Sequence, residues 1–180
     1  LLMAEECLLF PQAVNELIVY LQNELTRAGR VNYVQNVLIR YSLLNGEMMV
    51  VFITKDQAWR LKGLEEKIRE NFPQVACVYH NVNNNPKLML GKSFKLLSGQ
   101  EYLLDHIGEC KFKLSPQSFF QINNRQAEVL YDLVKEYAAL SGTETVLDLY
   151  CGIGTIGIYL AKQAKEIYGV ESVVQAVRDA

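Results

Sequence analysis

Residues 145–171 read TVLDLYCGIGTIGIYLAKQAKEIYGVE and decide the fold of this chain. The run 145–150 predicts a short strand, the glycine-led run 152–163 predicts a turn that opens a helix, and the run 166–171 predicts a second strand. A strand, a helix and a strand of this length form one βαβ unit, in which the two strands are parallel. The chain is therefore predicted to end in a βαβ unit.

Three glycines and one acid occupy fixed places in this unit. Gly152, Gly154 and Gly157 follow the first strand, and Glu171 closes the second strand about 20 residues further on. Gly152 and Gly154 let the backbone take turn angles and approach a ligand closely, while Gly157 lets a helix pack closely on a strand. A carboxylate at the end of the second strand can accept both ribose hydroxyls of an adenosine group. The pattern favours a Rossmann-like adenosine site over a turn that only joins a strand to a helix.

Asp148 bears on which cofactor such a site would hold. NAD places its pyrophosphate on the helix N-terminus, where a nearby carboxylate is repulsive. S-adenosylmethionine carries a sulfonium and an ammonium group and no phosphate, so an acid at Asp148, four positions before Gly152, is favourable. The sequence favours S-adenosylmethionine, and an NAD-dependent oxidoreductase is the alternative.

The residues before the βαβ unit predict an α+β arrangement. Apolar spacing predicts a helix over 11–28, and two strand-like runs, 33–42 and 47–54, are joined by Asn45-Gly46, which suits a tight hairpin turn. Further elements are expected over 56–71 (helix), 75–83 (strand), 88–116 (short strands) and 124–140 (helix, with Ala127, Leu130, Val134 and Ala138 on one stripe). Strands paired by hairpins, with helices on one face of the sheet, are the expected architecture.

Composition limits the class of protein. Half of the 180 residues are hydrophobic and 21% are charged, which is an ordinary globular balance. No apolar run is long enough to span a bilayer and the start does not resemble a signal peptide, so a cytoplasmic protein without membrane contact is expected. The absence of an initiator methionine and a helix that begins near Ser172 and looks unfinished predict a fragment of a longer protein.

Charge and cysteine content exclude other classes. The net charge is −2 and the lysines and arginines are scattered, which argues against RNA binding by this piece alone. The four cysteines form no CxxC pair, so neither a zinc site nor a dense disulfide framework is predicted.

Several blocks of the sequence resemble the RNA uracil-C5 methyltransferase family, which methylates ribosomal or transfer RNA. The resemblance covers essentially the whole chain. It lies in HNVNNNPKLMLG (80–91), LSPQSFFQINNRQAEVLYDLV (114–134), TVLDLYCGIGTIGIYLA (145–161) and YGVESVVQAVRDA (168–180). It implies a central α+β domain over 1–122, followed over 123–180 by the first βαβ unit of a truncated Rossmann-like S-adenosylmethionine-dependent methyltransferase domain.

The resemblance also implies which residues contact the cofactor. Gln121, Tyr150 and Glu171 would touch S-adenosylmethionine, and Gly152 and Gly154 would form the turn beneath it. Without the resemblance, Tyr150 reads as a buried strand residue and Gln121 as a turn or cap residue. Phe119 and Phe120 are expected in the core, although an aromatic ring here could also lie beside a flipped base.

The family's chemistry is covalent. A cysteine thiolate adds to C6 of uracil, the methyl group is transferred to C5, and a base removes the C5 proton. By the family's order the nucleophile and the base lie beyond residue 180, so no catalytic residue is expected within this chain, and Cys151 is not expected to be the nucleophile. The chain alone is predicted to be inactive, with weakened cofactor affinity at best.

Cys7 resembles the fourth ligand of the [4Fe-4S] cluster that some family members carry. The other three ligands are not in this chain, and a reduced cysteine at the start of a helix is the plain alternative. RNA is the expected partner of the full-length protein, with ribosomal RNA favoured over transfer RNA as the substrate, and no obligate protein partner is expected. The alternatives are an NAD-dependent oxidoreductase and, for this piece by itself, a non-catalytic RNA-binding or interaction module.

Overall fold

The computed structural model describes residue 8 and residues 10–180, so Cys7 lies outside the described residues. The chain divides into two compact units, which are described separately. Unit 1 comprises residues up to Leu103 except 43–45, and unit 2 comprises residues 43–45 and 104–180. None of the helices in the described part of the chain is long and apolar enough to cross a membrane.

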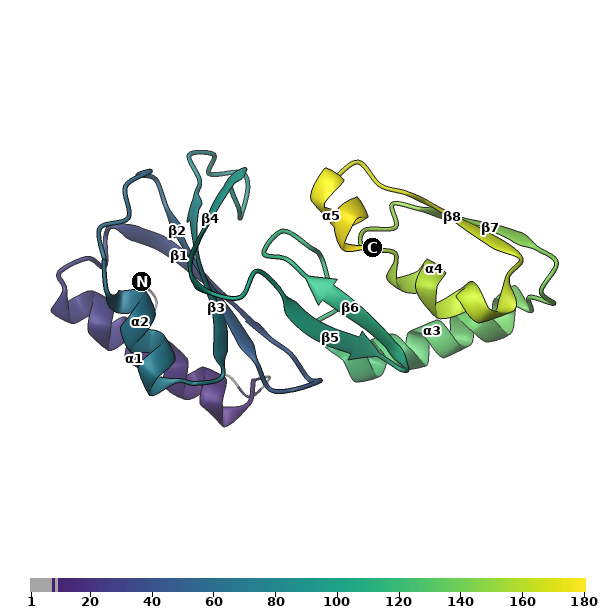
Figure 1. The fold of residues 1–180 in the computed structure, drawn as a ribbon, viewed down its shortest axis with the longest axis horizontal. Coiled ribbons are helices and arrows are strands. Elements are labelled where there is room, and N and C mark those ends of the chain that lie inside the picture. The colour runs from purple at the N-terminus through teal and green to yellow at the C-terminus, as the bar shows by residue number, and fades with distance from the viewer. Residues whose placement is uncertain (1–7, 9) are drawn as a thin grey trace. The chain divides into compact units, whose positions relative to one another are not determined.

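Unit 1 is a four-stranded sheet in the order β1-β2-β3-β4 with two helices (Figure 1). Its elements are α1 (Gln12–Arg27), β1 (Val34–Tyr41), β2 (Met48–Thr54), α2 (Leu64–Asn71), β3 (Val75–Val82) and β4 (Ser93–Gly99). β1 and β2 form the predicted antiparallel hairpin, with Gly46 at φ 75° in its turn. β3 is parallel to β2 and antiparallel to β4.

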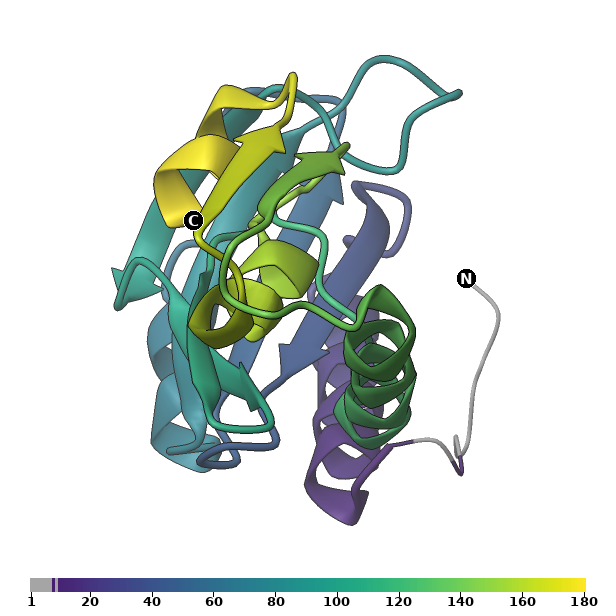
Figure 2. The ribbon, with the colours of Figure 1, turned by 90° about the vertical axis from the view of Figure 1, so that its right-hand side faces the viewer.

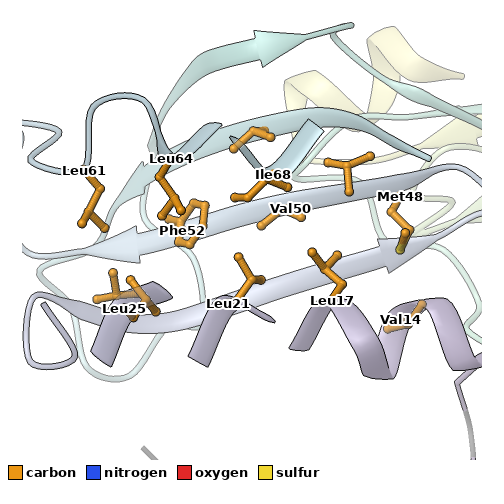
Figure 3. Packing of buried hydrophobic residues seen from close by; sticks show 13 residues of the cluster. Val14, Leu17, Leu21, Leu25, Met48, Val50, Phe52, Leu61, Leu64 and Ile68 are labelled. Carbon is orange, nitrogen blue, oxygen red and sulfur yellow. The ribbon is translucent and has the colours of Figure 1, made fainter. Parts of the chain in front are cut away.

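The core of unit 1 lies between the helices and one face of this sheet. Val14, Leu17, Leu21 and Leu25 recur at helical spacing on α1 and are at most 3% exposed. They point toward alternate residues of β2, and Ile68 of α2 completes the layer (Figure 3). Figure 3 labels Met48, Val50 and Phe52 among those strand residues. The helical spacing in the sequence thus predicted this face of α1 correctly.

Two details of unit 1 differ from the sequence prediction. The helix expected over 56–71 begins only at Leu64, because Gly63 before it has the left-handed φ of 84°. The strands are not all paired by hairpins either, since β2 and β3 are parallel and the chain crosses between them through α2.

Unit 2 contains the predicted βαβ unit. Its elements are β5 (Leu103–Ile107), β6 (Cys110–Leu114), α3 (Asn124–Ala138), β7 (Thr145–Leu149), α4 (Thr155–Leu160), a 3-10 turn (Ala161–Gln163), β8 (Glu166–Val170) and α5 (Val174–Asp179). β7 and β8 are parallel and pair from Thr145 with Glu166 to Leu149 with Val170, which confirms the βαβ prediction. α4 lies between α3 and this strand pair (Figure 1).

The β5–β6 hairpin explains why the compact units divide near residue 103, whereas the sequence placed a domain boundary between 122 and 123. Asn124 at the start of α3 donates a hydrogen bond from Nδ2 to the carbonyl of His106 on β5, at 2.9 Å. Lys162, after α4, forms an ion pair of 2.8 Å with Glu109 in the turn of the hairpin. The hairpin therefore packs with the residues that follow it.

The buried face of α3 is not the predicted stripe. Ala127 is buried as expected, but Leu130 is 52% exposed. The helix instead buries Asn124, Ala127 and Tyr131, and Tyr131 forms a hydrogen bond of 2.8 Å with Thr155 of α4. The contact with α4 determines which face of α3 is buried. The spacing of apolar residues could not predict this face, because it depends on the amphipathic side chain of Tyr131.

Candidate functional site

The turn between β7 and α4 is unusually sharp. Tyr150, Gly152 and Gly154 have φ angles of 60°, 58° and 73°, all in the left-handed region. Glycine takes such angles without strain, whereas a tyrosine there is uncommon and is a feature of functional sites. A Cβ added to Gly152 would meet no heavy atom within 4 Å. The space beside Gly152 is therefore open to a ligand.

Gly157 has the packing role that the sequence predicted. A Cβ at this position would lie 3.0 Å from Cγ2 of Ile167 on β8 and 3.3 Å from Oδ2 of Asp148 on β7. Only glycine lets α4 approach the two strands this closely. The first turn of α4 is thereby set closely against Asp148 of β7 and Ile167 of β8.

Glu171 is joined to the glycine turn by a hydrogen bond. The backbone N–H of Gly152 donates to Oε2 of Glu171 at 3.1 Å. The other oxygen, Oε1, accepts hydrogen bonds from the backbone N–H groups of Ser172 at 2.6 Å and Val173 at 2.8 Å. These bonds hold the pKa of the Glu171 carboxyl below its ordinary value, and the bond from Val173 has the largest effect. The structure thus brings two predicted site residues together around an ionised, oriented carboxylate.

Asp148 has a partner inside the protein. Its Oδ2 accepts a hydrogen bond of 3.1 Å from the backbone N–H of Gly157 in α4. This bond satisfies one of the unpaired N–H groups in the first turn of the helix. Asp148 therefore has a structural role at the start of α4. Its contact with a cofactor stays a prediction.

Tyr150 is 92% exposed, so the alternative that it is a buried strand residue is wrong. Its left-handed backbone turns the residue out of the line of β7. The ring is available to lie against a ligand at the glycine turn, as a ring wall requires.

Gln121 lies half-buried in the segment between β6 and α3, two residues before Asn123, the N-cap of α3. Within the same segment Phe120 is 7% exposed and packs on Phe112 with ring centroids 5.6 Å apart, which confirms the core prediction for Phe120. Phe119 is 72% exposed, so the core prediction is wrong for that residue.

A hydrogen-bond chain that the sequence did not predict fixes this segment. Ser118 is fully buried, and its hydroxyl contacts Ser115 at 2.7 Å and donates to the carboxylate of Asp179 on α5. Gln175, one turn earlier on α5, donates to the other oxygen of Asp179 at 2.8 Å. The segment that carries Gln121 is therefore tied to the helix that follows Glu171. Ser118 and Asp179 are far apart in sequence and belong to no common motif, so no local signal could have identified the pair.

Cys151 is placed as a packing residue rather than a nucleophile. Its Sγ lies 2.8 Å from where a Cβ of Gly169 on β8 would be, so the thiol fills the space that this glycine leaves. Partial burial, and then the negative charges of Asp148 and Glu171, raise the pKa of the Cys151 thiol. A thiol that resists ionisation is a poor nucleophile.

The thiol of Cys77 is also unsuited to attack. Cys77 is fully buried on β3, and burial raises the pKa of its thiol to about 12. Cys110 is half-buried with its Sγ 3.9 Å from the carbonyl of Ile158. Within residue 8 and residues 10–180, no group of three or more His, Cys, Asp or Glu side chains is placed to hold a metal ion.

Cys77 is expected to react with iodoacetamide at pH 8 about a thousandfold more slowly than an exposed thiol, because its pKa of about 12 leaves almost no thiolate. Because Cys77 is also fully buried, the reagent reaches it only when the chain opens, so the labelling should stay slow up to the pH at which the chain unfolds. Mass spectrometry of the alkylated peptides, with the urea-unfolded chain as the control, measures this rate. Equal labelling of Cys77 in the native and unfolded chains would show that the thiol is accessible and ionisable.

Comparisons with known proteins find relatives that are named as RNA methyltransferases. The chain is 45% identical over 148 residues to a Bacillus cereus protein named as an uncharacterized RNA methyltransferase. The aligned region covers 81% of this chain and 32% of that protein. It is 36% identical over 186 residues to an Oceanobacillus iheyensis protein of the same description, covering 98% of this chain and 40% of that protein. The chain therefore spans about a third to two-fifths of the length of these relatives. No family model matches it.

Solved structures show the same fold. A Pyrococcus abyssi tRNA (uracil-54, C5)-methyltransferase in complex with S-adenosyl-L-homocysteine matches with a TM-score of 0.75 and 26% identity, over 98% of this chain and 44% of that one. The M. jannaschii tRNA m1G37 methyltransferase matches with a TM-score of 0.50 and 12% identity, which supports the fold alone. The chain has the mixed α/β fold of S-adenosylmethionine-dependent methyltransferases, with a Rossmann-like βαβ unit.

Proposed function

We propose that this chain is part of an S-adenosylmethionine-dependent enzyme that methylates C5 of a uridine in ribosomal or transfer RNA. The observation that carries the proposal is the hydrogen bond of 3.1 Å between the Gly152 N–H and the Glu171 carboxylate, at an open glycine turn. The likeness to a uracil-C5 methyltransferase over 98% of this chain supports the reaction and the substrate class.

In this proposal, residues of unit 2 build the donor site. Glu171 accepts two backbone hydrogen bonds on Oε1 and one on Oε2, which leaves a lone pair on Oε2 to accept a ribose hydroxyl. Gly152 leaves the backbone open beneath the ligand, and Gly154 continues the left-handed turn. The exposed ring of Tyr150 forms a wall. Gln121 supplies an amide that can donate and accept. Asp148 adds a negative charge near the cationic end of the ligand.

The bound cofactor would supply an electrophilic methyl group, while the residues of this chain hold and orient it. We further propose that residues 1–180 alone do not methylate RNA, because the raised pKa values of the Cys77 and Cys151 thiols make them unsuited to add to C6 of uracil. The nucleophile and the base would come from another part of the intact protein. An iron–sulfur cluster with Cys7 as a ligand is a proposal for that protein only.

The reaction is tested with the intact protein that contains this chain. Incubation with S-adenosylmethionine and with either ribosomal or transfer RNA, followed by digestion to nucleosides, should yield 5-methyluridine from one of the two RNAs. Residues 1–180 tested in parallel should yield none. Methylation at another atom, or activity of residues 1–180 alone, would contradict the proposal.

The link between Ser118 and Asp179 yields a further prediction for the donor site. Asp179→Ala should weaken binding of S-adenosylmethionine about tenfold, because the segment carrying Gln121 loses a charge-assisted hydrogen bond that is worth about 1.5 kcal/mol. Arg178→Ala changes the exposed neighbour on the same helix and is the matched control. Calorimetric titration of both variants measures the difference. Equal affinities would mean that the link does not position the segment.

A further inference from the structure

The loop between β3 and β4, residues 83–92, is built on a buried asparagine. This segment is called the β3–β4 loop below. Asn81 is 0% exposed. Its Nδ2 donates to the carbonyls of Gly91 at 3.0 Å and Ser93 at 2.9 Å. Its Oδ1 accepts the N–H of Gly91 at 2.8 Å. One side chain thus fixes the returning end of the loop through three hydrogen bonds.

A second asparagine fixes the outgoing end. Asn83 is 7% exposed, donates from Nδ2 to the carbonyl of Leu88 at 2.7 Å and accepts the N–H of Asn85 at 2.9 Å. The backbone N–H of Asn83 donates to the carbonyl of Thr54 on β2 at 2.8 Å. The β3–β4 loop therefore has a defined shape that its own side chains determine, although it extends beyond the sheet (Figure 2).

This braced loop presents apolar side chains to solvent. Leu88 is 51% exposed and Met89 is 69% exposed, and both are flanked by exposed lysines, Lys87 and Lys92. Neighbouring apolar side chains held outward by a fixed backbone are typical of a binding surface.

The charge of the surrounding sequence is one-sided. Residues 71–100 contain three lysines, Lys87, Lys92 and Lys95, and no aspartate, glutamate or arginine, in a chain whose net charge is −2. An acidic residue outside this segment, Asp56, acts on His80 of β3 as Lys95 does. The charge of Asp56 is compensated by its ion pair with Arg60. The overall composition argues against RNA affinity, but this local segment is cationic.

We propose that the β3–β4 loop is an RNA-docking surface, with Lys87 and Lys92 on phosphates and Met89 and Leu88 against a base. The proposal rests on the proposed function, because it takes RNA as the substrate. Charge complementarity favours RNA over a protein partner, since each lysine that neutralises a phosphate releases a bound counterion. The fixed backbone adds to this, because a preformed loop loses little conformational entropy on binding.

Fluorescence anisotropy with this chain and a fluorescein-labelled oligouridine RNA tests the surface over a range of salt concentrations. Lys87→Gln/Lys92→Gln should weaken binding on the order of tenfold at about 0.1 M salt and reduce the salt slope by about 1.4. Lys62→Gln/Lys67→Gln removes the same charge from exposed positions in unit 1 and should change neither value. Leu88→Ser/Met89→Ser should weaken binding while the salt slope stays the same.

An equal loss of RNA affinity in the two double lysine variants would overturn the proposal. The absence of RNA binding by the unmodified chain at about 50 mM salt would also overturn it. Self-association of the chain that Leu88→Ser/Met89→Ser abolishes, with RNA affinity unchanged, would also overturn it by assigning the loop to a second copy. Titration of S-adenosylmethionine into the same variants separates this proposal from the proposed function. Lys87→Gln/Lys92→Gln should leave cofactor affinity unchanged, whereas a chain that binds RNA through the loop but binds no cofactor would refute only the donor site.

Discussion

Glu171→Ala is expected to weaken the binding of S-adenosylmethionine by this chain about a hundredfold. In the proposed site Oε2 of the carboxylate accepts a ribose hydroxyl, and a hydrogen bond to a charged group is worth about 1.5 to 3 kcal/mol. A loss of about 3 kcal/mol corresponds to somewhat more than a hundredfold in affinity. The variant also releases the N–H of Gly152, so the turn beneath the ligand loses one hydrogen bond, while the Cys151 N–H still donates to the carbonyl of Val170 at 3.1 Å. Calorimetric titration measures the change.

Glu166→Ala is the matched control, because it removes an exposed carboxylate from the other end of the same strand. Glu171→Gln keeps one oxygen acceptor and should give an intermediate affinity. Circular dichroism of each variant checks that the βαβ unit is still folded. If Glu171→Ala binds the cofactor as well as Glu166→Ala does, Glu171 does not hold the ribose.

Gly91→Ala should lower the free energy of unfolding of the chain by about 3 kcal/mol or more. A Cβ on this residue would lie 1.8 Å from the carbonyl oxygen of Val82 and 2.6 Å from its carbon, so the backbone of β3 or of the loop must move. Such a movement also breaks the two hydrogen bonds between Asn81 and Gly91. Urea unfolding followed by circular dichroism measures the loss.

Gly29→Ala separates this steric effect from backbone strain. Gly29 has a left-handed φ of 61° but no heavy atom within 4 Å of an added Cβ. Its replacement should therefore cost only about 1 to 2 kcal/mol, the cost of placing a residue with a Cβ in that conformation. A loss in Gly91→Ala no larger than that in Gly29→Ala would show that the β3–β4 loop can shift at little cost.

Local chemistry explains what the sequence predicted well. In a βαβ unit, backbone geometry brings the glycine turn after the first strand close to the end of the second strand. The βαβ unit and the Gly152–Glu171 pair could therefore be expected from the residues alone. The apolar spacing of α1 likewise leaves one face for burial. In both cases residues close in sequence determine the structure.

Long-range contacts explain what the sequence did not predict. The buried face of α3 depends on Tyr131 meeting α4, and the position of the segment around Ser118 depends on Asp179 near the end of the chain. Phe119 and Phe120 are identical in type, and only the packing of Phe112 decides which of them is buried. Periodicity carries no information on such contacts.

The same reasoning applies to the charge of the chain. The net charge of −2 favoured the prediction that this piece alone does not bind RNA, but a total does not show where the charges lie. The hydrogen bonds of Asn81 and Asn83 hold a short acid-free segment at the surface, and this arrangement became visible only in the structure.

Calorimetric titration of S-adenosylmethionine, and separately of NADH, into residues 1–180 tests the central claim most directly. We predict saturable binding of S-adenosylmethionine, lost in Glu171→Ala and kept in Glu166→Ala, with no heat from NADH. Saturable binding of NADH without binding of S-adenosylmethionine would contradict the account and would assign the glycine turn of β7 and α4 to a dinucleotide.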